Sequence, residues 1–247
     1  MRSKVLVFSL LIVLLFAIEV SDSDFSVPCG CVEEVTKQEE QVLGQQFQGT
    51  KEEIAAPEGE VSLLVNTYAR QLTVYEDGEE YYTFPVAVGE SDSRTPVGEW
   101  RIVEKVDMWE GTPFGDKWMR LNAVGGSYGI HGTNRPGSIG YATSNGCVRM
   151  FNQDVNLLYS WVEVGTKVKV VGPREYVQLT YPIQPGEVSM EVMSFQEKIR
   201  EYGFDPGDAN RRFREDTKQA VKELKYLYGL DRDALADGNV FYILGIR

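Results

Sequence analysis

One change of hydrophobic period divides this chain and constrains its fold more than any other feature. From Val61 to Val106 the pattern is that of β-strands, and Asp77-Gly78 separates two such runs as a hairpin turn does. Beyond residues 173–187, apolar residues recur every three or four positions, as on one face of a helix. We therefore predict a mainly β domain over 61–172, a linker over 173–187 and a small all-α domain over 188–247.

The β domain is predicted to contain many short strands and a single helix. Apolar residues spaced three apart mark the helix at 154–161. The clearest strand candidates are residues 71–75, 81–86, 100–103, 120–124 and 167–171. Many short strands with turn signals and one helix indicate a β-sandwich with a capping helix.

The first residues have the pattern of a targeting segment. Arg2 and Lys4 precede an apolar run over residues 5–18, which is shorter than the roughly 20 residues of a membrane span. We predict that residues 1–23 are a signal peptide or an uncleaved N-terminal anchor. This segment would engage the membrane at least during export, and the rest of the protein would lie outside the cytoplasm, in the cell wall or anchored facing it.

Residues 24–60 are predicted to be an acidic linker, because they are rich in Glu and Gln. Cys29 and Cys31 within it are expected to be exposed thiols, bridged to each other or to another chain, with lipid attachment as a weaker alternative. The formal net charge of −12 argues against nucleic acid as a partner, because nucleic-acid recognition needs a basic face.

The chain has a single histidine, His131, and one of its three cysteines, Cys147, follows it within a segment rich in Gly, Ser and Thr. An imidazole can take the proton of a thiol, which leaves a thiolate that attacks acyl carbons. The simpler interpretation of a lone cysteine is a small core residue, but the turn-prone Ser144-Asn145-Gly146 precedes this one. With one histidine, the chain lacks a readable zinc-ligand spacing. We expect no metal and no cofactor.

The same segment resembles the signature of the YkuD-type L,D-transpeptidases, cysteine enzymes that cross-link bacterial peptidoglycan. Asn145 occupies a position where many members have a second histidine. The motifs that carry the resemblance are His131-Gly132-Thr133, Ser138-Ile139-Gly140, Ser144-x-Gly146-Cys147-Val148-Arg149-Met150, Arg94-Thr95-Pro96-Val97-Gly98-Glu99-Trp100, Asn152-x-Asp154-Val155-x-x-Leu158-Tyr159 and Gly165-Thr166-x-Val168.

The resemblance and the residue types together assign roles. Cys147 would be the nucleophile and His131 the general base and acid. The backbone N–H groups of Gly146 and Cys147 would face the oxyanion. A backbone carbonyl near Tyr128 or Gly129 would orient His131.

Arg149, Ser144 and Tyr128 are the candidate substrate-binding residues. Arg149 would pair with a substrate carboxylate, or else form a structural salt bridge. Ser144 would line the site or hydrogen-bond the loop backbone, and the second role is favoured. Tyr128 would form a wall of the cleft, as would Trp109, Trp118 and Arg135, and each of these four could equally serve packing.

The resemblance implies that the substrate is a peptidoglycan tetrapeptide stem. The enzyme would release its terminal D-alanine and join the third residue to the side-chain amine of a neighbouring stem, which gives a 3–3 cross-link. Two alternatives remain open: an L,D-carboxypeptidase that uses water as the acceptor, and a non-catalytic peptidoglycan-binding protein. The sequence does not indicate the preferred diamino acid, or whether the protein serves growth or spore formation.

The C-terminal domain is predicted to hold three helices. The first carries Val188, Val192, Phe195, Ile199 and Tyr202, the second covers 215–228 and the third 240–246. The layout resembles the three-helix peptidoglycan-binding domain, through Gln196 with Ile199, Tyr202-Gly203-Phe204-Asp205-Pro206-Gly207, Phe213, Thr217, Ala220-Val221 and Gly229-Leu230.

Three residues of this domain depart from the family pattern. Arg211 and Arg214 stand where glycine is usual, and Asn210 stands where Asp is usual. Because these residues shape the loop between helices, they bear on glycan binding more than on the fold. The alternative role is a helical module that packs on the β domain or binds a protein.

Overall fold

The computed structural model describes residues 54–109 and 111–246, and Ala55–Arg247 forms one compact unit. The predicted signal peptide or anchor, Cys29, Cys31 and nearly all of the acidic linker lie outside the described residues. None of the helices in the described part combines the length and hydrophobicity that a membrane-spanning helix needs.

Strands dominate the first part of the described chain and helices the last part. Its elements are β1 (Val61–Asn66), β2 (Gln71–Glu76), β3 (Glu79–Pro85), β4 (Val88–Gly89), β5 (Gly98–Asp107), β6 (Lys117–Leu121), β7 (Gly129–His131), the 3-10 helix η1 (Pro136–Ser138), β8 (Ala142–Ser144), β9 (Val148–Arg149), α2 (Asn152–Trp161), β10 (Lys167–Val171), α3 (Met190–Glu201), α4 (Glu215–Leu227) and α5 (Gly238–Ile243). The predicted fold class, a mainly β domain followed by a small all-α domain, is confirmed.

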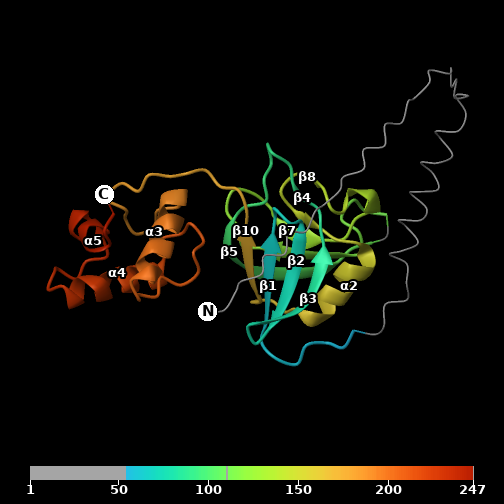
Figure 1. The fold of residues 1–247 in the computed structure, drawn as a ribbon, viewed down its shortest axis with the longest axis horizontal. Coiled ribbons are helices and arrows are strands. Elements are labelled where there is room, and N and C mark those ends of the chain that lie inside the picture. The colour runs from blue at the N-terminus through green and yellow to red at the C-terminus, as the bar shows by residue number, and fades with distance from the viewer. Residues whose placement is uncertain (1–53, 110, 247) are drawn as a thin grey trace, which may run out of the picture. The chain divides into compact units, whose positions relative to one another are not determined.

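One curled eight-stranded sheet forms the β domain, in the order β3-β2-β1-β10-β5-β6-β7-β9, with β4 and β8 paired separately (Figure 1). The long strand β5 joins its two halves. Gly98–Arg101 pair with β10, and Ile102–Asp107 pair with β6. The two layers expected of a sandwich are thus halves of a single sheet that share β5.

The hairpin predicted at Asp77-Gly78 is confirmed. Both residues have positive φ, 51° and 88°, which is the backbone of the two-residue turn that matches strand twist. On the paired strands, Leu72, Val74 and Phe84 are fully buried. Alternation along β2 and β3 therefore supplies one face of the core.

The helix predicted at 154–161 is α2, which begins two residues earlier. Val155, Leu158 and Trp161 are buried as their spacing requires, and Trp161 packs 5.8 Å from the ring of Phe84. The helix contacts β6 and β7 and so caps the part of the sheet that carries His131.

The strand predicted at 120–124 is shifted, because β6 covers Lys117–Leu121. Asn122 ends it with two hydrogen bonds to the backbone of Arg101. Its side-chain oxygen accepts from the Arg101 N–H at 2.8 Å, and its own N–H donates to the Arg101 carbonyl at 3.1 Å. A side chain thus takes the place of the next backbone pairing.

The three C-terminal helices are also present, although the third, predicted at 240–246, is α5 and covers Gly238–Ile243. Ser189 caps α3 by accepting from the Val192 N–H, and Asp237 caps α5 in the same way through Asn239 and Val240. Their shared core contains Ile183, Val192, Phe195, Ile199, Phe213, Ala220, Val221, Leu224, Ala236, Val240, Phe241 and Leu244.

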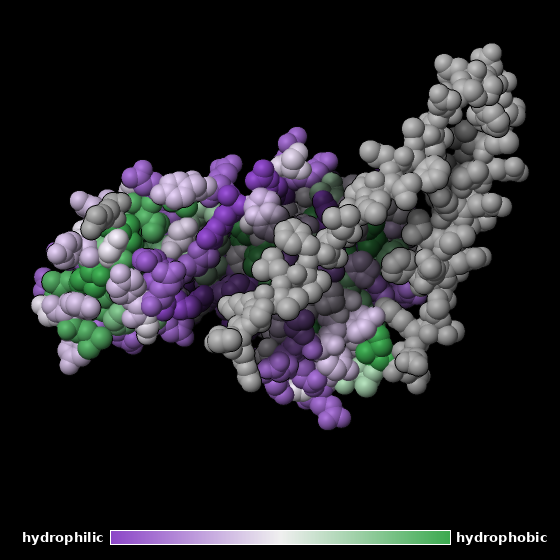
Figure 2. Space-filling model, in the orientation of Figure 1, coloured by the Kyte–Doolittle hydropathy of each residue, from purple (hydrophilic) through white to green (hydrophobic). Residues whose placement is uncertain are grey.

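Ion pairs join the helical domain to the start of β5. Arg200 of α3 holds both oxygens of Glu99 at 3.0 and 2.9 Å, and Arg101 holds both oxygens of Asp208 at 2.7 and 2.8 Å. The Ala209 N–H donates to Glu99 as well. Figure 2 shows hydrophilic residues, in purple, gathered where the C-terminal helices approach the sheet.

Candidate functional site

Strand pairing brings Cys147 and His131 together. Strand β9 runs parallel to β7, with Val148 opposite Ile130 and Arg149 opposite His131. Side chains alternate along strands, and Val148 and Ile130 are both fully buried. Arg149 and His131 therefore share the other face, and Cys147, one residue before β9, continues the same alternation toward that face.

The loop before Cys147 is held by Ser144. The Ser144 Oγ donates to the Cys147 carbonyl at 2.6 Å and accepts from the Gly146 N–H at 3.1 Å. Ser144 is 0% exposed, so it has no surface for a substrate. Its assignment as a substrate-binding residue is therefore replaced by the favoured alternative, a hydrogen bond to the loop backbone.

The same hydrogen bond bears on the oxyanion site. Because the Gly146 N–H is donated to Ser144, it is not free to face an oxyanion in this structure, and the Cys147 N–H is the candidate that remains. Gly146 has φ of 105°, and a Cβ at this position would lie 2.6 Å from Cε1 of Tyr128. Glycine is needed here for the turn and for the close approach of Tyr128.

His131 lies in an aromatic pocket and is 3% exposed. The Trp118 ring stacks on it at 5.3 Å, and the Phe114 ring meets it edge-on at 5.1 Å. Its Nδ1 donates to the Gly132 carbonyl at 2.5 Å, so the orienting carbonyl belongs to Gly132 and not to Tyr128 or Gly129. Because a carbonyl only accepts, Nδ1 carries the hydrogen of the neutral ring, and Nε2 is the nitrogen able to take a proton.

Burial keeps both reacting groups neutral. It lowers the pKa of His131 to about 4, against the hydrogen bond to Gly132, and the positive charge of Arg149 lowers it further. Burial also raises the pKa of the Cys147 thiol, although a backbone hydrogen bond from Gly129 and the charge of Arg149 oppose the rise. The thiol lies 3.9 Å from the Ser127 carbonyl that accepts from it. At neutral pH the resting groups are thus a protonated thiol and a neutral imidazole.

Arg149 is half-buried, and its Nη1 lies 3.4 Å from the Thr143 carbonyl. Among the described residues, no carboxylate lies within ion-pair distance of it. The structural salt bridge that was its alternative role is therefore not formed there. Its guanidinium can receive a carboxylate beside Cys147.

The other candidate wall residues differ in placement. Tyr128 is half-buried and packs against Gly146, and Trp118 packs on His131. Trp109 is 82% exposed, and Arg135 is also exposed. Tyr128 and Trp118 thus border the site, whereas no contact joins Trp109 or Arg135 to His131 or Cys147 within the described ranges.

Three positioning groups were not predicted from the sequence. Phe114 packs on His131, the Ser127 carbonyl accepts from the thiol, and the Asn152 side chain accepts from the Thr133 N–H at 2.9 Å. A Cβ at position 132 would lie 2.2 Å from the same Asn152 oxygen. The glycine of His131-Gly132 was the one sequence signal of this close approach.

Residues 54–109 and 111–246 contain no group of three or more His, Cys, Asp or Glu side chains placed to hold a metal ion. What the site offers is a thiol, an imidazole that can accept a proton, the backbone N–H of Cys147 and a guanidinium. This set is suited to acyl transfer through a covalent intermediate on sulfur.

Comparisons with known proteins agree on one family. Residues 60–170 match the model of the "L,D-transpeptidase catalytic domain", and residues 189–244 match that of the "Putative peptidoglycan binding domain". The "Putative L,D-transpeptidase YkuD" of Bacillus licheniformis is 44% identical over 108 residues, which are 44% of this chain and 64% of that protein. The chain therefore spans less than two thirds of that relative's length.

Two further proteins extend the comparison. The "Putative L,D-transpeptidase YqjB" of Bacillus subtilis is 36% identical over 126 residues, which cover 45% of this chain and 72% of the relative. The solved structure of the L,D-transpeptidase from Mycobacterium smegmatis aligns with 46% of this chain and 59% of its own, at 24% identity and a TM-score of 0.40.

Proposed function

Because this chain belongs to the L,D-transpeptidase family, we propose that it is a cysteine transpeptidase that forms 3–3 cross-links between peptidoglycan stems. The observation that carries the proposal is the parallel pairing of β7 with β9, which puts His131 and Cys147, one residue before β9, on the same side of the sheet. Arg149 on the same face supplies a charge for a substrate carboxylate.

In the proposed acylation, Nε2 of His131 accepts the proton of the Cys147 thiol. Since the pKa of the thiol is raised and that of the imidazole is lowered, transfer before attack is uphill. We therefore propose that the proton moves as sulfur attacks the carbonyl of the third stem residue. The Cys147 N–H stabilises the oxyanion, the C–N bond breaks, and His131 returns the proton to the departing D-alanine.

The second half-reaction restores the enzyme. The side-chain amine of a neighbouring stem attacks the thioester and gives its proton to His131. The C–S bond breaks, a new amide forms, and the thiolate takes the proton back from His131. Water in place of the amine would make the same residues a carboxypeptidase.

We propose that the C-terminal domain binds peptidoglycan and that the protein works outside the cytoplasm, in the wall or anchored facing it. The match of residues 189–244 supports the first proposal. The basic and apolar pattern of residues 1–23 supports the second, since it is typical of a segment used in export.

The test is mass spectrometry on the purified chain incubated with a disaccharide-tetrapeptide, in parallel with the Cys147→Ala variant. We expect a dimer with loss of one D-alanine, an acyl-enzyme on Cys147, and neither product with the variant. Both proteins should sediment with purified peptidoglycan. A tripeptide without dimer would indicate the carboxypeptidase, and turnover by Cys147→Ala would rule out the cysteine mechanism.

A further inference from the structure

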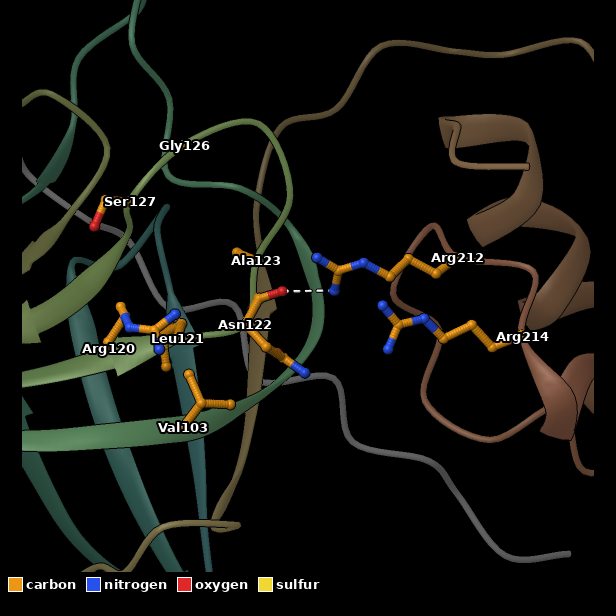
Figure 3. A pocket seen from close by; sticks show the side chains of 9 residues that line it. All are labelled: Val103, Arg120, Leu121, Asn122, Ala123, Gly126, Ser127, Arg212 and Arg214. Atoms are coloured by element: carbon orange, nitrogen blue, oxygen red, sulfur yellow. Dashed lines mark hydrogen bonds between the residues drawn. The ribbon is translucent and has the colours of Figure 1, made fainter. Parts of the chain in front are cut away.

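A cleft of about 610 Å³ lies beside the candidate site, between the β domain and the loop that leads into α4 (Figure 3). On the side of the β domain it is lined by the end of β6 and the segment before β7, including Arg120, Asn122 and Ser127. Arg212 and Arg214 of the helical domain line the other side. In Figure 3 both of these arginines point across the cleft toward Asn122.

The loop that carries these arginines is held firmly. Gln196 is 1% exposed, and its side chain donates to the Arg212 carbonyl at 3.0 Å and accepts from the Asn210 N–H at 3.1 Å. Arg211, between them, has φ of 67°, a backbone conformation that favours glycine. Its guanidinium donates to the Val97 carbonyl of the β domain at 3.2 Å.

The cleft carries positive charge that no carboxylate of residues 54–109 and 111–246 pairs with. Arg120 is paired with Glu104 at 2.7 Å, but none of the described carboxylates lies within ion-pair distance of Arg212 or Arg214. Nη1 of Arg212 donates a hydrogen bond to the Asn122 carbonyl at 2.7 Å. Burial lowers the pKa of Arg212, and the charge of Arg214 lowers it further, so the two guanidiniums repel each other. An anion between them would relieve this repulsion.

Ser127 belongs both to the cleft and to the surroundings of the Cys147 thiol. It lines the cleft, and its carbonyl oxygen accepts from the Cys147 thiol. The wall of the cleft formed by the segment before β7 therefore lies next to the sulfur.

We propose that this cleft binds a carboxylate of the acceptor stem peptide, with Arg212 and Arg214 as its ligands, while the acceptor's amine reaches the thioester on Cys147. The proposal rests on the transpeptidase function proposed above. A donor's terminal carboxylate lies one residue from the carbonyl under attack, so Arg149, on the face of Cys147, is placed to receive it. The C-terminal carboxylate of an acceptor tripeptide lies a side chain's length from its reacting amine, which requires a more distant subsite.

The first test varies the acceptor at a fixed donor concentration. Arg214→Gln should raise the KM for an acceptor tripeptide about tenfold, as expected for the loss of one charge-assisted hydrogen bond. Amidation of the acceptor's carboxylates should raise the KM of the wild type to a similar degree. The same amidation should raise the KM of Arg214→Gln little further. Arg232→Gln removes an equal charge from an exposed site in the same domain, over the Tyr226 ring, and should behave as wild type.

A second measurement does not depend on turnover. In the Cys147→Ala background, calorimetry should show weaker binding of the free-carboxylate tripeptide when Arg214→Gln is added, and no such loss for the amidated peptide. Arg214→Lys keeps the charge, so its affinity for the free-carboxylate tripeptide should lie between that of the protein with Arg214 and that of Arg214→Gln. Equal binding of both peptides, an unchanged acceptor KM, or slower acylation by the donor in place of the acceptor effect would overturn the proposal. Failure of the wild type to form an acyl-enzyme would instead overturn the proposed function.

Discussion

The single imidazole of this chain lies where water is excluded, and this sets its protonation. Aromatic rings cover His131 and a backbone carbonyl fixes its tautomer, so the ring stays neutral well below its usual pKa. A neutral imidazole and a neutral thiol differ from a preformed thiolate–imidazolium pair, because in the proposed mechanism the proton then moves during the attack on substrate.

This difference predicts a pH profile. The rate of acyl-enzyme formation should fall on the acid side near pH 4 and not near 6.5, because protonation of His131 removes the base only there. The rate should still climb into the alkaline range, since burial raises the pKa of Cys147. Measurements of kcat/KM for acylation between pH 4 and 10 test this. An acid limb near 6.5 would show that the imidazole is not desolvated as described.

The same pKa predicts a dependence of stability on pH. The folded-state pKa of His131 is lower than that of the unfolded chain, so the unfolded state binds more protons between the two values. Stability is fully present above about pH 6.5 and falls as the pH drops toward 4, by on the order of 3 kcal/mol from this group alone. Denaturant titrations of wild type and His131→Gln across this window measure the difference in slope. Parallel curves would contradict the assignment.

At the scale of elements, the turn into β9 determines where Cys147 points. Gly146 has positive φ and lies under the Tyr128 ring, while Ser144 ties both sides of the turn together. Neither the turn nor its contact with Tyr128 tolerates a side chain at position 146.

Gly146→Ala should therefore lower the acylation rate more than tenfold and destabilise the fold by about 1–3 kcal/mol. The matched control is Gly140→Ala. Gly140 also has positive φ, 89°, but nothing lies within 4 Å of the Cβ it would gain. Gly140→Ala should lose stability only through the strained backbone conformation and should keep its activity. Similar activity losses in both variants would show that the contact with Tyr128 is unimportant.

Local signals were sufficient for the hairpin at Asp77-Gly78 and for the helix at 154–161, because turn chemistry and apolar spacing act over a few residues. They were insufficient for the end of β6, where the Asn122 side chain replaces a backbone pairing with Arg101. The site shows the same division. His131 and Cys147 could be selected by residue type. The hydrogen bond from the Gly146 N–H to Ser144, which removes that N–H as an oxyanion donor, depends on how the loop closes.

At the scale of the molecule, the two domains meet through charges. Glu99 at the start of β5 is the centre of this contact, since Arg200 and the Ala209 N–H both donate to it. The arginines at 211 and 214 departed from the family pattern in the sequence. In the structure Arg211 contacts the β domain and Arg214 lines the cleft beside it. The sequence pattern of the helical domain alone could not predict these contacts, because they depend on residues of the β domain.

The contact predicts how the domains separate. Burial alone would raise the pKa of Glu99, but hydrogen bonds from Arg200 and Ala209 outweigh it, and the pKa is lowered. The attachment is therefore present above the ordinary value of 4.5 and is lost as the pH falls through the lower folded value. Glu99→Gln removes the charge at every pH, so at pH 7 it should already loosen the contact by about 1–3 kcal/mol.

The measurement is limited proteolysis of the 173–187 linker combined with small-angle scattering at pH 7. Glu99→Gln should be cut several-fold faster than wild type and should have a larger radius of gyration. Glu201→Gln is the control, because Glu201 pairs with Lys198 within α3 and is exposed. If the cleft needs both domains to form, Glu99→Gln should also raise the acceptor KM, as Arg214→Gln does, while its β domain still forms the acyl-enzyme. If the linker is cut faster but the acceptor KM is unchanged, contact between the two domains is not needed for acceptor binding. The cleft would then have no role in catalysis.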